Sequence, residues 1–322
     1  MTNKKSELAN KKFEISGDLL LVLLLDKTTN KNIIWGTSDY SHKGDCFEAR
    51  SEIKLNLITG INLDLVQPRV KKNEIDKKKR AKEKAEVFTP SWACNHQNNL
   101  IDDSWFSKPN NFNFEISNGW KVNEDKISFP EGRTWMDYVL DTRLEITCGE
   151  APYISSRYDA VRGDFIELKS RIGILDRKMR VINENVKNTE LWIEWTKKAF
   201  ESVYGYEWQG DNLLIARKNL LYTFIDYYYN KFESAPSIDL LKSISEIISW
   251  NFWQMDGLKG VVPFSCDNKE IYQLNLFGDE IIKECAGCKS QSIEMHNGIY
   301  CEIMDWKKKK KVKFINILGR QK

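Results

Sequence analysis

The chain has 322 residues, of which 41% are hydrophobic and 12% aromatic, and this composition excludes a disordered protein. The formal net charge is only +3, and the longest apolar run, "LLLVLLL", is too short to span a bilayer. No small-residue cleavage site follows that run, and seven scattered cysteines favour a reducing compartment, so we expect a cytoplasmic protein without a membrane segment.

Residues 1–68 are predicted to be β-rich. Their apolar runs, "DLLLVLLLD", "KNIIWGT" and "EIKLNLITGINLDLV", are split by Gly, Asn and Asp, which is typical of short strands joined by turns. We interpret the first run as a buried strand.

Two segments are strongly basic. Residues 69–86 combine many lysines with good helix propensity, so we expect an exposed helical linker there. The second segment, "KKKKKVK", occupies residues 307–313. Both are either solvated surface or a surface that contacts phosphates.

Residues 87–322 are predicted to form an α/β domain. Strands are expected at "RLEIT", "GYEW", "SEIISWNFWQMDG" and "KVKFINILG", with helices at "LWIEWTKKAFESVY" and "DNLLIARKNLLYTFIDYYYNKF". Residues 87–135 look loop-rich, and residues 154–190 irregular. Strands that alternate with helices predict a parallel sheet with helices on both faces.

Parallel sheets bind ligands beyond the carboxyl ends of their strands, so residues just after the predicted strands are the candidates for a site. Gly149 lets a backbone approach a ligand closely, and Glu145 can hold the loop or a ligand amine. The alternative is an ordinary turn.

Two further acids end predicted strands. Glu207 offers two carboxylate oxygens that suit the hydroxyls of a ribose, although it can instead cap the helix that follows. Asp256 can accept a hydrogen bond from an adenine amine, or can simply form an Asp-Gly turn with Gly257.

The order of four stretches resembles N6-adenine DNA methyltransferases of the gamma arrangement. "EVFTPSW" precedes "EITCGEAPY", followed by "YGYEW" and "NFWQMDGL". The sequence around these stretches is also similar to proteins called restriction endonuclease subunit M. The resemblance implies a Rossmann-like S-adenosylmethionine-dependent methyltransferase fold and a cofactor site. The residues that it implies for this site are Phe88, Thr89, Pro90, Glu145, Cys148, Gly149, Tyr153, Glu207, Trp208 and Asp256.

The sequence departs from that family in the glycine loop, in the length between Glu145 and Glu207, and in the catalytic motif. Ala151 stands where the family has a second glycine, which leaves the backbone less free. The chain contains no Pro-Pro, so it lacks the [NDS]-P-P-[YF] tetrapeptide that activates the flipped adenine in the family. Asn251 and Trp253 are the candidates for a substitute.

Two functions therefore stay open. The first is a DNA adenine-N6 methyltransferase, or a subunit of one, in a restriction-modification or defence system, with DNA and a partner protein that supplies catalytic or target-recognition parts. The second is a non-catalytic scaffold that binds the cofactor and DNA. A nuclease built on Asp164, Glu167 and Lys169 is less favoured, because its two acids stand only three positions apart.

A cysteine-rich insertion is expected at about residues 259–306. "CAGCKSQSIEMHNGIYC" supplies Cys285, Cys288, His296 and Cys301, which have the ligand types and number of a tetrahedral zinc site. Cys266 is an alternative ligand, and thiols without a metal are the other interpretation.

Overall fold

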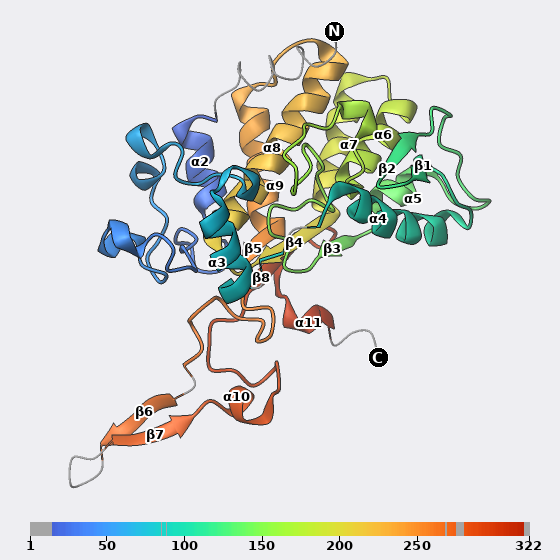
Figure 1. The fold of residues 1–322 in the computed structure, drawn as a ribbon. Helices are drawn as coiled ribbons and strands as arrows, with labels where there is room; N and C mark the ends of the chain where they lie inside the picture. Colours follow the sequence, from blue (N-terminus) through green and yellow to red (C-terminus); the bar gives the residue numbers. More distant parts are fainter. Residues whose placement is uncertain (1–14, 85, 88, 268, 275–279, 319–322) are drawn as a thin grey trace.

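A three-stranded parallel sheet organises the chain. The computed structural model describes residues 15–84, 86–87, 89–267, 269–274 and 280–318 as a mixed α/β protein (Figure 1). Strands β3 (Arg143–Glu145), β4 (Val203–Glu207) and β5 (Phe252–Gln254) lie in the order β3-β4-β5. The predicted strands at these positions are confirmed.

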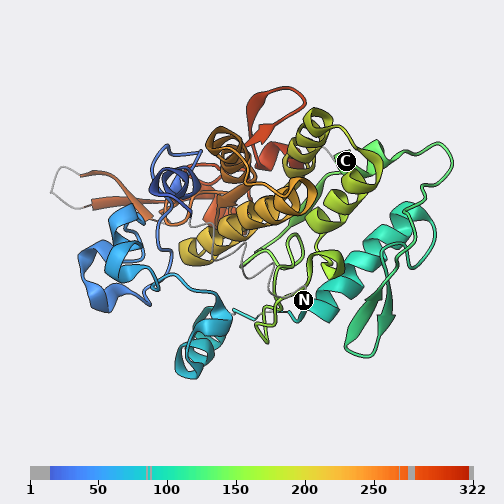
Figure 2. The same ribbon diagram turned by 90° about the horizontal axis from the view of Figure 1, so that it is seen from above.

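A helical layer covers one face of this sheet. It contains α6 (Ile174–Asn185), α7 (Thr189–Glu201), α8 (Gly210–Phe232) and α9 (Ile238–Asn251). Val203 and Phe252 join the core that these helices share. Figure 2 shows the blue segment of residues 15–68 on one side of this layer and, on the other, the green hairpin formed by β1 (Asn113–Ile116) and β2 (Gly119–Val122).

The other face of the sheet meets a smaller core. Tyr206 and Trp253 pack there against Phe314 and Ile303, which belong to the C-terminal segment. That segment contains β8 (Glu302–Asp305), β9 (Lys310–Lys313) and α11 (Ile315–Leu318). Among the described residues, a hairpin therefore stands where a second helical layer was expected, and the Rossmann-like assignment stays a prediction.

The prediction of a β-rich N-terminal region is wrong for residues 15–68. The first apolar run forms helix α2 (Gly17–Leu24), followed by short 3₁₀ turns that include Ser41–Lys43, Asp45–Phe47, Leu55–Leu57 and Gly60–Asn62. Leu19, Leu20, Leu23 and Leu24 are buried while Leu21 is half exposed, which is the periodicity of a helix and not of a strand. A short apolar run without alternation does not distinguish the two.

Arg217 explains how α2 is held. This fully buried side chain on α8 donates to the carbonyls of Leu23 and Leu25 at the end of α2, and to the carbonyl of Phe252 in β5. One guanidinium thus ties the N-terminal helix to the sheet, and supplies partners for carbonyls that a helix end leaves free.

Three other segments differ from expectation. "SEIISW" ends helix α9 instead of forming a strand, and strand β9 gives way to α11 within "KVKFINILG". Residues 154–190 contain α6 as well as irregular structure. The stretch expected to be loop-rich contains α4 (Ser91–Phe106), hairpin β1 (Asn113–Ile116) with β2 (Gly119–Val122), and α5 (Trp135–Leu140).

The basic segment is helical, as predicted, but it is anchored. A 3₁₀ turn (Arg69–Lys71) precedes helix α3 (Glu74–Lys84). Arg80 is 2% exposed and pairs with Asp211 at 2.8 Å, with Glu86 at 2.6 Å and with Asp39 at 3.0 Å. Asp211 lies in the first turn of α8, so a buried ion-pair network fastens α3 to the main body.

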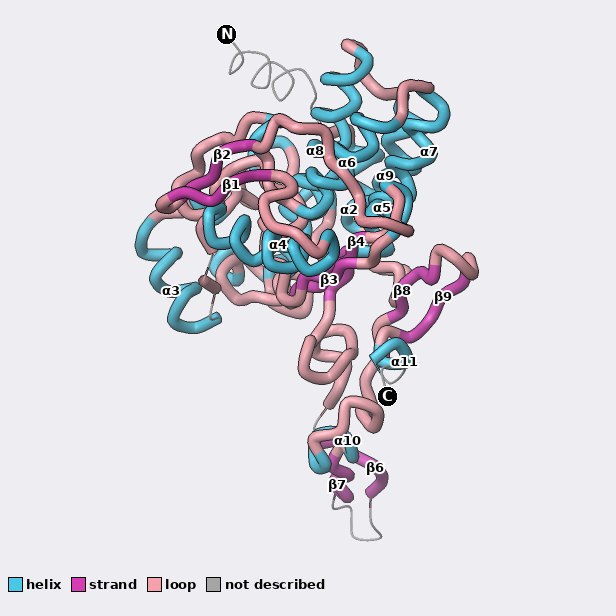
Figure 3. The backbone as a smooth tube through the Cα atoms, turned by 90° about the vertical axis from the view of Figure 1, so that its right-hand side faces the viewer, coloured by secondary structure: helices cyan, strands magenta, loops and turns pink. Residues whose placement is uncertain are grey.

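A narrow arm extends from the body. Its hairpin consists of β6 (Lys269–Leu274) and β7 (Glu280–Glu284), and the short helix α10 (Ala286–Ser290) follows (Figures 1 and 3). The arm lies between β5 and β8 in sequence, within the predicted insertion. No described helix has the length and apolar character needed to cross a membrane.

Candidate functional site

A cavity of about 720 Å³ opens beyond the carboxyl ends of β3 and β4. Its walls are the loop after β3, the turn between β4 and α8, the segment before α4, and one side of α4. The lining includes Thr89, Glu145, Cys148, Gly149, Tyr153, Glu207 and Trp208. This is the edge at which an open parallel sheet is expected to bind ligands.

The loop after β3 carries unusual backbone geometry. Thr147, Gly149 and Ala151 have φ values of +46°, +53° and +61°. Glycine adopts this conformation without strain, whereas a β-branched residue such as Thr147 rarely does. Ala151 thus occupies a position that suits glycine, as the departure in the sequence indicated, and the loop stores local strain beside the cavity.

Glu207 holds two loops together. Its Oε2 accepts the backbone N–H of Gly149 at 2.8 Å, and its Oε1 accepts those of Trp208 and Gln209 at 3.0 Å each. Burial raises the pKa of Glu207, against the lowering effect of these bonds. Since each carboxylate oxygen has two lone pairs, this carboxyl retains acceptor capacity toward the cavity.

Glu145 has an unsatisfied oxygen. Its Oε1 accepts the Tyr153 N–H at 3.4 Å, while the buried Oε2 has no hydrogen-bond partner. Burial raises the pKa of Glu145 well above its usual range, and the neighbouring Glu207 adds to the effect. A ligand group that donates a hydrogen bond would satisfy this free oxygen.

Cys148 is shielded from solvent. Its side chain is 2% exposed, and burial raises the pKa of its thiol well above the usual range, with Glu145 and Glu207 contributing. A Cβ on Gly205 would lie 3.2 Å from that of Cys148 and 2.6 Å from the ring of Phe252. The small residue in β4 therefore lets the loop pack onto the sheet.

The segment before α4 meets the cavity only in part. Thr89 lines it, whereas Pro90 is the N-cap residue of α4 and does not. Phe88 lies outside the described residues. The side chain of Tyr153 forms part of the wall, and Trp208 donates its indole N–H to the carbonyl of Gly36 at 2.8 Å.

Helix α4 supplies residues that the motifs did not identify. Asn98 lines the cavity, and its amide donates to the carbonyls of Tyr153 and Ile172 at 2.9 and 3.0 Å. Asn95, Asn99 and Asp102 lie buried on the same helix, where Arg177 bonds all three. The three- and four-residue spacing of these polar residues in "CNHQNNLID" was the available signal.

Like Pro90, the predicted residues Asp256, Asn251 and Trp253 lie outside the cavity lining. Asp256 accepts the backbone N–H groups of Leu258 and Lys259 at 3.0 and 3.3 Å, as in an Asp-Gly turn, so its contact with adenine stays a prediction. The amide of Asn251 bonds the carbonyls of Phe200 and Val203.

Trp253 is likewise committed to the protein interior. It is 2% exposed, its indole N–H lies 3.2 Å from the sulfur of Met255, and its ring packs on Tyr206 and Phe314. The structure therefore gives neither Asn251 nor Trp253 a free polar or stacking face at the cavity.

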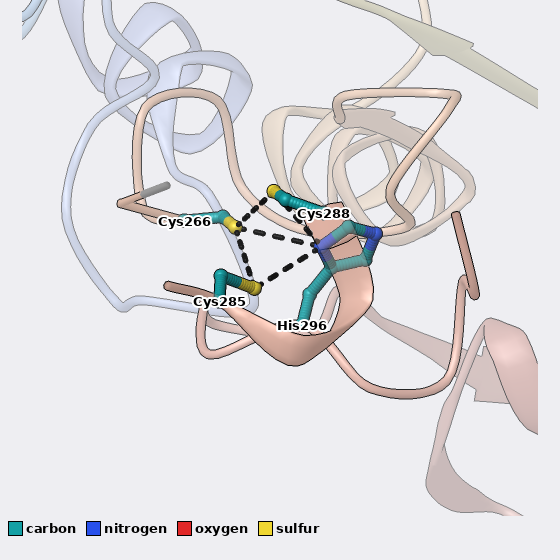
Figure 4. A group of neighbouring side chains, drawn as sticks. All are labelled: Cys266, Cys285, Cys288 and His296. Carbon is teal, nitrogen blue, oxygen red and sulfur yellow. Dashed lines mark hydrogen bonds between the residues drawn. The ribbon is translucent and has the colours of Figure 1, made fainter. Parts of the chain in front are cut away.

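A second site lies at the base of the arm. Cys266, Cys285, Cys288 and His296 converge there, with their donor atoms within 4.8 Å of one another (Figure 4). All three cysteines are free, Cys285 is buried, and Cys266 and Cys288 are partly buried. Three thiols and an imidazole in this arrangement can hold a metal ion.

The prediction that Cys301 belongs to the cluster is wrong, and the alternative ligand Cys266 lies there instead. The Cys301 thiol is fully buried under the sheet and lies 3.5 Å from the carbonyl oxygen of Gln254. Cys301 immediately precedes β8, which packs in the smaller core, so the chain has already left the cluster at that point.

No known protein family, no curated protein and no solved structure matches the chain. Its function therefore has to be inferred from the geometry of these two sites.

Proposed function

We propose that this chain is a cytoplasmic S-adenosylmethionine-binding protein with a Rossmann-like cofactor domain, acting as a DNA adenine-N6 methyltransferase or as a subunit of one. The observation that carries the proposal is the cavity after β3 and β4. Residues of three motifs, separated widely in the sequence, line this one space.

The chemistry of the lining fits this cofactor. S-adenosylmethionine carries a cationic amino group, a positively charged sulfonium, a ribose diol and an adenine. Glu145 would hold the amino group with its unpaired oxygen, and Glu207 would accept from the ribose hydroxyls. Thr89, Tyr153 and Trp208 complete the wall, and the bound cofactor would supply the methyl group.

Methyl transfer to adenine needs more than this cavity. Activation of the amine requires hydrogen-bond acceptors, and the flipped base requires an aromatic stack. The sequence has no [NDS]-P-P-[YF] tetrapeptide, and Asn251 and Trp253 are occupied by structural contacts. We therefore propose that a partner protein contributes the adenine-activating groups or the target-recognition part.

The second candidate is a non-catalytic scaffold that binds the cofactor and DNA. The complete engagement of Asn251 and Trp253 favours it, because these were the chain's own candidates for the catalytic role. A methyl-transfer assay with and without the partner separates the two functions. For the Cys/His cluster we propose zinc, since thiolates and imidazole are its usual ligands in structural sites.

A calorimetric titration with S-adenosylmethionine tests the proposal. We expect saturable binding by the wild-type chain, weakened by about 1–3 kcal/mol in Glu207→Gln, the cost of disturbing a buried hydrogen-bonding partner. Glu190→Gln, at an exposed position in the first turn of α7, is the matched control and should bind as the wild type does. A folded wild-type chain that takes up no cofactor would refute the proposal.

A further inference from the structure

We propose that one zinc ion, bound by Cys266, Cys285, Cys288 and His296, clamps the base of the β6–β7 arm and, through Phe264, holds Trp208 in the wall of the cavity. This inference rests on the zinc proposed above, but not on the identity of the cofactor.

The donor atoms match a tetrahedral zinc site (Figure 4). Zinc–sulfur bonds of about 2.3 Å and zinc–nitrogen bonds of about 2.0–2.1 Å, at tetrahedral angles, place donor atoms roughly 3.5–3.8 Å apart. The Sγ of Cys266 lies 3.6 Å from those of Cys285 and Cys288 and 3.5 Å from His296 Nδ1. The two other sulfurs each lie 3.6 Å from that nitrogen.

The local backbone permits this close approach. A Cβ on Gly287 would lie 2.6 Å from the backbone nitrogen and 2.7 Å from Nδ1 of His296, so only glycine fits between the two cysteines beside the ring. The Gly287 N–H donates to the carbonyl of Met295 at 2.9 Å, and the His296 N–H donates to the hydroxyl of Tyr300 at 2.7 Å. These bonds orient His296 toward the thiols.

The ligands stand at both ends of the hairpin. Cys266 precedes β6 and Cys285 directly follows β7, while the first backbone pair of the hairpin joins Lys269 to Glu284. An ion shared by these two cysteines therefore closes the arm at its base. Four protein ligands leave no open position, which is the arrangement of a structural site and not of a catalytic one.

Phe264 links the metal site to the cavity. It lies two positions before Cys266 and has a φ of +61°, a conformation that a bulky residue adopts only when its surroundings hold it there. Its ring meets that of Trp208 edge-on, with the ring centroids 5.1 Å apart. The guanidinium carbon Cζ of Arg50 lies 4.8 Å from the centroid of the Phe264 ring.

Trp208 in turn lines the cavity. Arg50 also donates to the carbonyl of Phe264 at 3.3 Å. Release of Cys266 from the ion would free the segment that carries Phe264, and thus loosen one wall of the cavity. The inferred coupling therefore runs over a short, contiguous set of contacts.

Metal content is the first measurement. Full-length protein expressed with zinc should contain about one zinc ion per chain, as expected for one four-ligand site. Cys266→Ser should lose most of the metal, whereas Cys301→Ser and the exposed control Cys46→Ser should keep it. Wild-type protein without zinc, or loss of zinc from Cys46→Ser but not from Cys266→Ser, would overturn the site.

Hydrogen–deuterium exchange tests the clamp. After removal of zinc from the wild-type protein by a chelator, verified by metal analysis, amides of residues 260–267 and 206–210 should exchange several-fold faster. Amides of α6 and α7, which are remote from the arm, should be unchanged. Loss of zinc with no change near Trp208 would refute the coupling, and neither result depends on whether S-adenosylmethionine binds.

Discussion

Thr147 shows how much a single residue contributes to the loop after β3. Its side chain is exposed, yet its φ of +46° lies in the left-handed region, which β-branched residues avoid. We expect Thr147→Gly to raise the free energy of unfolding by about 1 kcal/mol, because it relieves strain without removing buried contacts. Thr142→Gly, at an exposed position without positive φ, should lower it. Denaturant unfolding measures both, and a destabilised Thr147→Gly would contradict the strain.

The unpartnered oxygen of Glu145 leads to a separate prediction about ligand binding. Because its Oε2 is buried without a partner, the carboxyl costs stability in the free protein and gains a partner only with a ligand. Glu145→Gln should therefore keep or improve the free energy of unfolding, yet weaken S-adenosylmethionine binding about tenfold or more, as expected for a lost charge-assisted bond. Calorimetry and unfolding on the same preparation check both effects. Unchanged affinity would exclude Glu145 as the partner of the amino group.

Glu150 gives the stability a pH dependence. Burial raises its pKa from 4.5 to about 7, and its oxygens accept the N–H of Arg69 and the hydroxyl of Tyr158. A raised pKa means that the folded state binds the proton more tightly, so this stabilisation is complete below pH 4.5 and is lost as the pH rises through about 7.

Glu150→Gln should remove that loss. The free energy of unfolding of the variant should rise relative to that of the wild type as the pH increases from 4.5 to about 7. The change should be on the order of 3 kcal/mol, since one pKa unit corresponds to about 1.4 kcal/mol. Urea unfolding at several pH values measures it, with the exposed Glu131→Gln as control. A difference that does not vary with pH would refute the assignment.

At the scale of elements, helix α3 depends on one arginine. Arg80 is buried among Asp211, Glu86 and Asp39, whereas Lys78 on the same helix is exposed. Removing one partner of a buried ion pair leaves charges uncompensated, so Arg80→Ala should lower the free energy of unfolding by about 3–5 kcal/mol. Lys78→Ala should have little effect. Equal effects in the two variants would show that α3 is not anchored through Arg80.

Elements with a clear pattern were predictable from sequence. Helices α7 and α8 repeat buried residues at helical spacing, and β3 and β4 each end at a glutamate. Helix α2 was not predictable, because a short run of Leu and Val fits a buried strand equally well. Its helical state depends on packing against α8 and α9, to which Arg217 contributes from almost two hundred positions away.

The two sites differ in the same way. Ligand types in the cysteine cluster follow from composition, but the choice of Cys266 over Cys301 depends on where the chain turns back to the sheet. In the cavity, motif residues after β3 and β4 were predictable, whereas Asn98 enters from α4 through tertiary packing. The Asp-Gly turn that the sequence offered as the alternative for Asp256 is present, since its carboxylate accepts the backbone N–H of Leu258.

At the scale of the whole molecule, the proposal assigns this chain the cofactor-binding part of a methyltransferase, and the sequence lacks the tetrapeptide that activates adenine in the family it resembles. We expect the isolated chain to transfer few or no methyl groups to a mixed-sequence DNA duplex, because activation of adenine needs acceptors on its amine and an aromatic stack on the base. The sequence has no [NDS]-P-P-[YF] tetrapeptide, and the candidate substitutes Asn251 and Trp253 make structural contacts in the interior. Incorporation of tritiated methyl groups measures this. Robust transfer by the lone chain would contradict the proposal, and Asn251→Ala would then show whether Asn251 is responsible.

DNA binding by the chain should be weak and dependent on salt. The exposed lysines of α3 and the basic hairpin at residues 307–313 are the expected phosphate contacts. Release of counterions makes such binding fall steeply with salt concentration. Fluorescence anisotropy with a duplex at several salt concentrations measures the slope of log affinity against log salt concentration. Lys310→Ala combined with Lys311→Ala should reduce the magnitude of this slope by about two. A slope unchanged by this pair would exclude the hairpin.

The most direct test of the central claim is a crystal structure of the chain grown with S-adenosylmethionine. We expect the cofactor in the cavity beyond β3 and β4, with its ribose hydroxyls on Glu207 and its amino group on Glu145. Cofactor bound elsewhere, or a cavity that stays free of it at saturating concentration, would contradict the proposed cofactor site.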